Sequence, residues 1–84
     1  MTIFVANFDY ETEESDFKTL FGNFGTVEDV QIARHWRTDK WLGYAFVEMP
    51  IDAEAKRAIE ELDGRRWNGQ RLKVSEKQSK RRRY

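Results

Sequence analysis

The chain has no cysteine, only one proline and no long apolar run, and these absences exclude several classes of protein. Without cysteine there is no disulfide framework, no thiolate metal site and no cysteine nucleophile. No apolar run approaches the ~20 residues that a membrane-spanning helix needs, and the N-terminus lacks a signal-peptide pattern. With 84 residues the chain has room for one domain. We therefore expect a soluble cytoplasmic protein, nuclear in a eukaryote, with no membrane partner.

The net charge is zero, but the charges are unevenly distributed. Residues 1–70 contain 8 basic and 14 acidic residues, a net charge of −6, whereas residues 71–84 contain 7 basic and 1 acidic residue, a net charge of +6. A basic segment of this kind indicates an interaction of its own. The alternative is that it only keeps the protein soluble.

Two segments have the alternation of β-strands and carry aromatic rings on the face away from the aliphatic one. In residues 3–8, Ile3 and Val5 share one face and Phe4 lies on the other. In residues 42–49 the small and aliphatic residues share one face, and the opposite face consists of Leu42, Tyr44, Phe46 and Glu48. Exposed rings need a flat apolar ligand, and unpaired nucleobases are such ligands.

Two helices are predicted between and after these strands. The first has Thr12 as its N-cap and ends near Gly25; the second has Asp52 as its N-cap and ends at Gly64. Their apolar stripes are Phe17, Leu20, Phe21 and Phe24 in the first helix, and Ala55, Ala58, Ile59 and Leu62 in the second.

Further strands are expected over residues 27–34, with Gln31 outward, and over residues 67–75, with Leu72 and Val74 inward. The order βαββαβ is that of an α+β, ferredoxin-like split βαβ sandwich, with a four-stranded antiparallel sheet and two helices on one face. The domain is expected over residues 1–75, followed by a basic, disordered tail over residues 76–84. Two helices cover only one face of such a sheet, so the aromatic face is expected to be open.

The two aromatic strands also resemble the paired motifs of the RNA recognition motif (RRM) family. The longer family motif reads basic, Gly, aromatic, small, aromatic, Val, any residue, aromatic. Residues 43–47 match it, whereas Leu42 and Met49 depart from it at the two ends. The resemblance extends over about residues 2–75 and implies the same fold and a single-stranded RNA partner. In the family, the positions of Phe4 and Phe46 stack on successive bases and that of Tyr44 packs between sugars.

Candidate RNA-binding residues are the aromatic residues of the open face, their polar neighbours, and basic residues of the loop and tail that would contact phosphates. They are Phe4, Asn7, Gln31, Arg34, Arg37, Lys40, Trp41, Tyr44, Phe46, Arg71, Lys73, Ser75 and Lys77. Single-stranded DNA is an alternative ligand. We expect a monomer without a cofactor. We also expect no metal site, because His35 is the only histidine and the chain has no cysteine.

Two other classes of function compete with RNA binding. A protein-interaction module on the same scaffold would use Trp36, Trp41 and Leu42 as an apolar anchor, and the loss of a basic residue at Leu42 favours it. A small ferredoxin-like enzyme such as an acylphosphatase needs a phosphate-cradling loop with an arginine after the first strand, where residues 7–11 supply acid instead. No nucleophile–base pair stands out, so no enzyme activity is expected.

Overall fold

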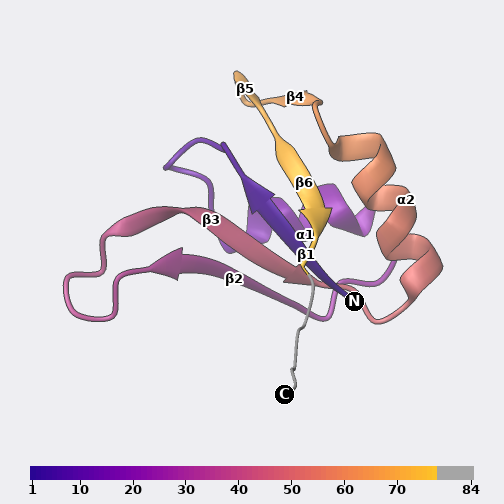
Figure 1. Ribbon diagram of the computed structural model, residues 1–84, viewed down its shortest axis with the longest axis horizontal. Helices are drawn as coiled ribbons and strands as arrows, with labels where there is room; N and C mark the ends of the chain where they lie inside the picture. Colours follow the sequence, from indigo (N-terminus) through magenta and orange to yellow (C-terminus); the bar gives the residue numbers. More distant parts are fainter. Residues whose placement is uncertain (78–84) are drawn as a thin grey trace, which may run out of the picture.

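The computed structural model describes residues 1–77. Four strands form one antiparallel sheet in the order β2-β3-β1-β6, and β4 and β5 form a separate small hairpin (Figure 1). The elements are β1 (Thr2–Ala6), α1 (Glu14–Gly22), β2 (Asp29–Arg34), β3 (Trp41–Glu48), α2 (Asp52–Leu62), β4 (Arg66–Trp67), β5 (Gln70–Arg71) and β6 (Lys73–Glu76). The predicted ferredoxin-like fold is confirmed. The disordered tail was predicted over residues 76–84, but Glu76 belongs to β6, and residues 78–84 lie outside the described part of the chain.

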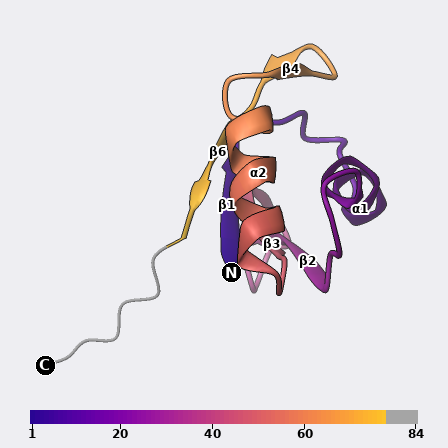
Figure 2. The ribbon, with the colours of Figure 1, turned by 90° about the vertical axis from the view of Figure 1, so that its right-hand side faces the viewer.

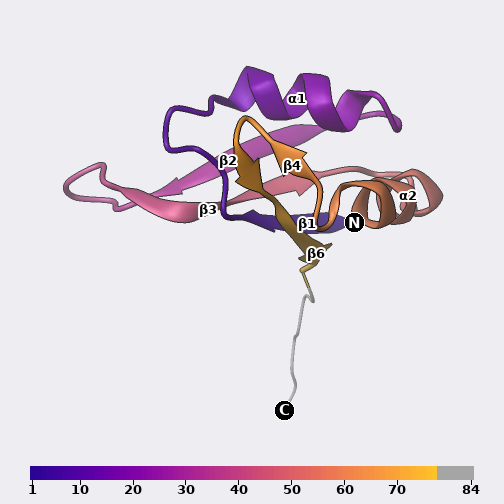
Figure 3. The same cartoon turned by 90° about the horizontal axis from the view of Figure 1, so that it is seen from above.

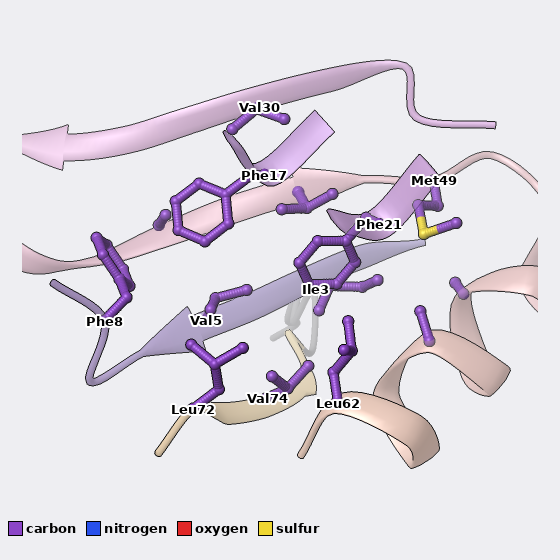
Figure 4. Close-up of a cluster of buried hydrophobic side chains, with 14 residues drawn as sticks. Ile3, Val5, Phe8, Phe17, Phe21, Val30, Met49, Leu62, Leu72 and Val74 are labelled. Carbon is purple, nitrogen blue, oxygen red and sulfur yellow. The ribbon is translucent and has the colours of Figure 1, made fainter. Parts of the chain in front are cut away.

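Both helices bury their apolar stripes against the same face of the sheet. Phe17 and Phe21 of α1 are fully buried and lie over Ile3 and Val5 of β1 (Figure 4). From α2, Leu62 joins the same cluster. Figure 3 shows α1 lying over one face of the sheet, and Figure 2 shows both helices to the same side of β6. The opposite face of the sheet therefore carries no helix.

Both predicted N-caps are wrong by one residue. The N-cap of α1 is Glu13, whose backbone N–H donates to the Asp16 carboxylate at 2.9 Å. Thr12 is buried instead, and its hydroxyl has no hydrogen-bond partner within residues 1–77. The N-cap of α2 is Ile51, and Asp52 is the first helical residue. There Asp52 interacts favourably with the helix dipole without capping, which explains why its sequence signal was off by one position.

The single strand predicted over residues 67–75 is also wrong, because the chain turns back on itself within it. Trp67 pairs with Gln70 across a two-residue turn in which Asn68 and Gly69 have φ of 52° and 81°. Positive φ at both positions is the mark of a tight hairpin turn, and Asn-Gly is its preferred sequence. Consequently β6 begins at Lys73 and continues through Glu76, which pairs with Ile3.

Candidate nucleic-acid interface

The strand register brings four predicted site residues into one row across the open face. Gln31 lies opposite Phe46, Phe46 opposite Phe4, and Phe4 opposite Ser75. Residues directly opposite each other on neighbouring strands project from the same face of a sheet. The row therefore has aromatic residues at its centre and polar residues at both ends.

Three half-buried rings form the centre of the open face, and we call them the aromatic platform: Phe4, Tyr44 and Phe46. The ring centroids lie 5.8 Å apart for Phe4 and Tyr44, 5.9 Å for Phe4 and Phe46, and 5.5 Å for Tyr44 and Phe46. The rings thus support one another while staying partly exposed, as the alternation of both strands predicted. None of them belongs to the buried core cluster.

The last strand lines one side of this platform with polar and basic residues. Lys73 lies opposite Ala6, and Ser75 lies opposite Phe4. The backbone N–H of Lys77 donates to the carbonyl of Thr2 at 2.8 Å, so the chain follows β1 beyond the end of β6. The Lys77 ammonium nitrogen lies 5.7 Å from the centre of the Phe46 ring, a cation–π contact.

Two predicted site residues are engaged with each other at the end of β1. The Asn7 side-chain amide donates to the backbone carbonyl of Arg71 at 2.7 Å, and Asn7 itself has a positive φ of 64°. Arg71 belongs to β5 rather than to the strand that carries Lys73 and Ser75. The expected placement of Arg71 beside those two residues is therefore wrong, and its contact with Asn7 ties β5 to the sheet.

The basic loop that joins β2 and β3 in a hairpin is a tight turn closed by backbone hydrogen bonds. Its closing bonds run from the N–H of His35 to the carbonyl of Lys40 and from the N–H of Asp39 to the carbonyl of His35, both at 2.8 Å. The Nδ1 atom of His35 accepts hydrogen bonds from the backbone N–H groups of Arg37 and Thr38 at 3.2 and 3.4 Å. This nitrogen therefore helps to hold the loop backbone in place.

The exposed groups of this hairpin are basic and aromatic. Trp36 is 82% exposed, and the guanidinium carbon of Arg37 lies 4.9 Å from its ring centre. Arg34 lies opposite Trp41 at the base of the hairpin, and Arg34 and Lys40 are exposed. The hairpin therefore extends the open face with cations and one accessible tryptophan.

A bulge at the start of β3 changes the surroundings of Leu42. The pairing passes from Ile32 and Ala45 directly to Arg34 and Trp41, and Gly43 has a φ of 89°. A bulge interrupts the alternation of side chains, so the simple rule that placed Leu42 beside Tyr44 does not carry across Gly43. Leu42 is 46% exposed.

The other end of the open face is acidic, and sequence reasoning missed two of its residues. Asp29 lies opposite Glu48, and Glu48 lies opposite Thr2. The hydrogen bond from the Thr2 hydroxyl is the main cause that lowers the pKa of Glu48, and the N-terminal amine of Met1 also donates to this carboxylate. Alternation could have placed Thr2 and Asp29 on the open face, since they lie two positions from Phe4 and Gln31, but it does not show that Asp29 and Glu48 lie opposite each other.

Two negative findings apply to residues 1–77. No three His, Cys, Asp or Glu side chains gather closely enough in this part of the chain to hold a metal ion. No helix there has the length and apolar character needed to cross a membrane.

Comparison with known proteins gives a consistent result. The sequence profile described as "RNA recognition motif" matches residues 3–73. The "Putative RNA-binding protein RbpD" of Nostoc sp. is 43% identical over 75 residues, which are 89% of this chain and 80% of that protein. The "Putative RNA-binding protein RbpA" of Synechocystis sp. is 41% identical over 75 residues, with 89% and 74% of the two chains covered.

Solved structures agree with the sequence relatives. The crystal structure titled "RNA Binding Protein PG1" superimposes with a TM-score of 0.89 at 33% identity and covers 98% of this chain and 99% of its own. A Sex-lethal protein/RNA complex superimposes with a TM-score of 0.86 at 28% identity, covering 94% of this chain and 47% of that one. This chain belongs to the RNA recognition motif family.

Proposed function

We propose that this protein binds single-stranded RNA on the open face of its sheet. The observation that carries the proposal is the aromatic platform, three mutually supporting rings held half-exposed on a face that no helix covers. Every nucleobase has a π-face, and stacking on an aromatic side chain contributes roughly 1–3 kcal/mol per base. Such a surface suits unpaired bases of any sequence.

In this proposal successive bases stack on Phe4 and Phe46, and Tyr44 packs against the sugars between them. Polar residues beside the platform contact base edges, and cations contact phosphates. The polar and basic candidates are Asn7, Gln31, Arg34, Arg37, Lys40, Arg71, Lys73, Ser75 and Lys77, and Trp41 is a further aromatic candidate. Among them, Gln31 and Ser75 are supported by lying in one row with the two stacking rings.

The relatives support the same ligand. RbpD and RbpA are RNA-binding proteins by name, and one structural relative was solved as a complex with RNA. We also propose that the protein acts by binding rather than by catalysis. We place this activity in the cytoplasm, because the relatives are bacterial and bacterial RNA is cytoplasmic.

One observation favours a protein partner as a second candidate function. Trp36 is 82% exposed and Leu42 is 46% exposed near the same end of the sheet, and large exposed apolar side chains mark interaction surfaces. A protein-binding role of the hairpin does not explain why the aromatic platform is held half-exposed on the open face. RNA binding is therefore the function that the geometry supports best.

The test compares one RNA strand with the same strand in a duplex. Fluorescence anisotropy should give tighter binding of the single strand by about tenfold or more, since two bases that stack at roughly 1–3 kcal/mol each together exceed that factor. Paired bases offer no free faces, and a flat sheet does not enter the narrow major groove of A-form RNA. Equal affinity for both ligands would contradict the proposal and indicate attraction of charges alone.

A further inference from the structure

A hollow lies on the open face directly beside the aromatic platform, at the end of the sheet where β1 begins. We call it the acidic hollow, and its lining consists of Thr2, Asp29, Gln31, Phe46, Glu48 and Lys77. Phe46 belongs to both features, so a base stacked on its ring in the proposed function would lie beside the hollow. The lining groups thus face whatever that base presents at its edge.

The hollow contains two carboxylates and one ammonium group. Asp29 and Glu48 lie directly opposite each other, and like charges in this position destabilise a sheet. The Asp29 side chain has no hydrogen-bond or ion-pair partner within residues 1–77, whereas Glu48 accepts hydrogen bonds from Thr2 and Met1. Asp29 is therefore an acceptor that the protein itself does not satisfy.

This charge decides which part of an RNA strand the hollow accepts. The N-terminal amine of Met1 lies 3.3 Å from the Glu48 carboxylate, and the Lys77 ammonium nitrogen lies over the Phe46 ring, so Asp29 is the carboxylate of the hollow without an ion-pair partner within residues 1–77. A phosphate placed at Asp29 would meet this unpaired negative charge and be repelled. The hollow thus takes a base edge rather than the backbone. An ionised carboxylate only accepts hydrogen bonds, so that edge must supply donors.

Of the four RNA bases, guanine fits this requirement best. Its Watson–Crick edge carries two neighbouring donors, N1–H and the N2 amino group, which match the two oxygens of one carboxylate. Adenine and cytosine place one amino donor beside a ring-nitrogen acceptor, and uracil places one donor between two carbonyl oxygens. Each of these three would bring an acceptor against the Asp29 carboxylate, which costs free energy.

We propose that Asp29 selects guanine for the base that stacks on Phe46. Gln31 lies opposite Phe46, and Asp29 lies two pairs along the same two strands, on the same face, at the diagonal separation of roughly 7–8 Å that long groups span. A base on the ring reaches toward both residues. Asp29 is thus a specificity-determining residue, and this inference rests on the proposed stacking of RNA on the aromatic platform.

The test uses short oligouridines that carry one central guanosine, inosine or adenosine. Inosine keeps the N1–H of guanosine and lacks only its N2 amino group. The unaltered protein should bind the guanosine strand roughly 5- to 150-fold tighter than the adenosine strand, the range of a good bidentate base contact, with inosine between them. Asp29→Asn should bring the three affinities to within about twofold of each other, because one oxygen becomes a donor.

A matched control separates base reading from the general effect of charge. Glu28→Gln removes the same charge one residue away, at an exposed position that does not belong to the lining of the hollow. It should strengthen binding of all strands alike and preserve the guanosine preference. The inference is overturned if the unaltered protein does not distinguish guanosine from inosine, or if Asp29→Asn keeps that distinction. If RNA still binds in those cases and the binding depends on Phe46, the proposed function stands without the inference about Asp29. If no strand binds, both the proposed function and the inference are overturned.

Discussion

Replacing Phe46 by alanine should separate RNA binding from folding. The ring stacks on one base in our proposal, so its loss should weaken single-stranded RNA binding by roughly 1–3 kcal/mol, a 5- to 150-fold rise in Kd. The free energy of unfolding should fall much less. Phe46 is half-buried and outside the core cluster, so its truncation opens no internal cavity.

The stability cost of Phe46→Ala is that of its ring contacts on the sheet surface. The ring pairs with Phe4 and Tyr44 at centroid distances of 5.9 and 5.5 Å. Phe4 lies opposite Phe46 on the neighbouring strand, and a cross-strand pair of this type contributes roughly 0.2–1 kcal/mol relative to alanine. For a domain of this size, 1 kcal/mol corresponds to a change in Tm of roughly 4–8 °C.

Phe21→Ala is the contrasting variant. Phe21 is 0% exposed within the core, and removing such a ring costs roughly 3–5 kcal/mol of folding free energy. Thermal unfolding and RNA titration of both variants should therefore give opposite patterns, with Phe46→Ala folded but weak in binding and Phe21→Ala unstable. A folded Phe46→Ala protein that binds RNA like the unaltered one would refute the stacking argument.

Three further predictions concern charge. Leu42→Lys should strengthen RNA binding and steepen its salt dependence, because Leu42 is 46% exposed next to the basic hairpin and a cation there adds to the attraction for phosphates; weaker binding would instead identify Leu42 as an apolar contact. The hydrogen bond from Thr2 is the main cause that lowers the pKa of Glu48 in the folded protein. Ionised Glu48 therefore stabilises the fold at pH values above the pKa that it has in the unfolded chain. This stabilisation is lost as the pH falls through the folded-state pKa. Thr2→Val should raise the pKa of Glu48 in an NMR titration and reduce that acid sensitivity, and an unchanged pKa would contradict the assignment. Deleting residues 78–84, which contain four basic residues, should lower the log–log salt slope of RNA binding by about 0.7 for each phosphate that these residues neutralise, whereas an unaltered slope would leave solubility as the role of this segment.

The fold was predictable because the burial pattern in the sequence has clear periods. Alternation placed Ile3 and Val5 in the core and Phe4 on the open face, and the spacing of Phe17 and Phe21 placed one face of α1 over them. Both patterns report burial, which is the main determinant of how these elements pack. The same alternation predicted Phe46 on the open face.

The two local features that the sequence pattern failed to predict, a hairpin and a bulge, depend on local backbone geometry. The hairpin at Asn68-Gly69 was missed although this dipeptide is a strong turn signal, because the inward positions of Leu72 and Val74 suggested one long strand. The bulge at Gly43 likewise breaks the alternation of β3, so the face of Leu42 does not follow from the sequence pattern. Alternation assumes an unbroken strand, so it fails wherever the backbone adopts positive φ.

The acidic hollow was missed for a different reason. Asp29 and Glu48 are far apart in the sequence, and only the register of β2 with β3 places them opposite each other. Periodicity within one strand gives the face of a residue but not its neighbour on the next strand. Contacts across strands therefore required the structure.

An NMR titration would show whether unpaired RNA lies on the open face of the sheet. Backbone amide resonances of the whole protein would be followed as a short single-stranded RNA is added. The account predicts the largest shifts in β1 and β3 around Phe4 and Phe46, smaller ones in β6, and almost none on the exposed side of α2. Shifts confined to the hairpin around Trp36, or centred on the helices, would contradict it.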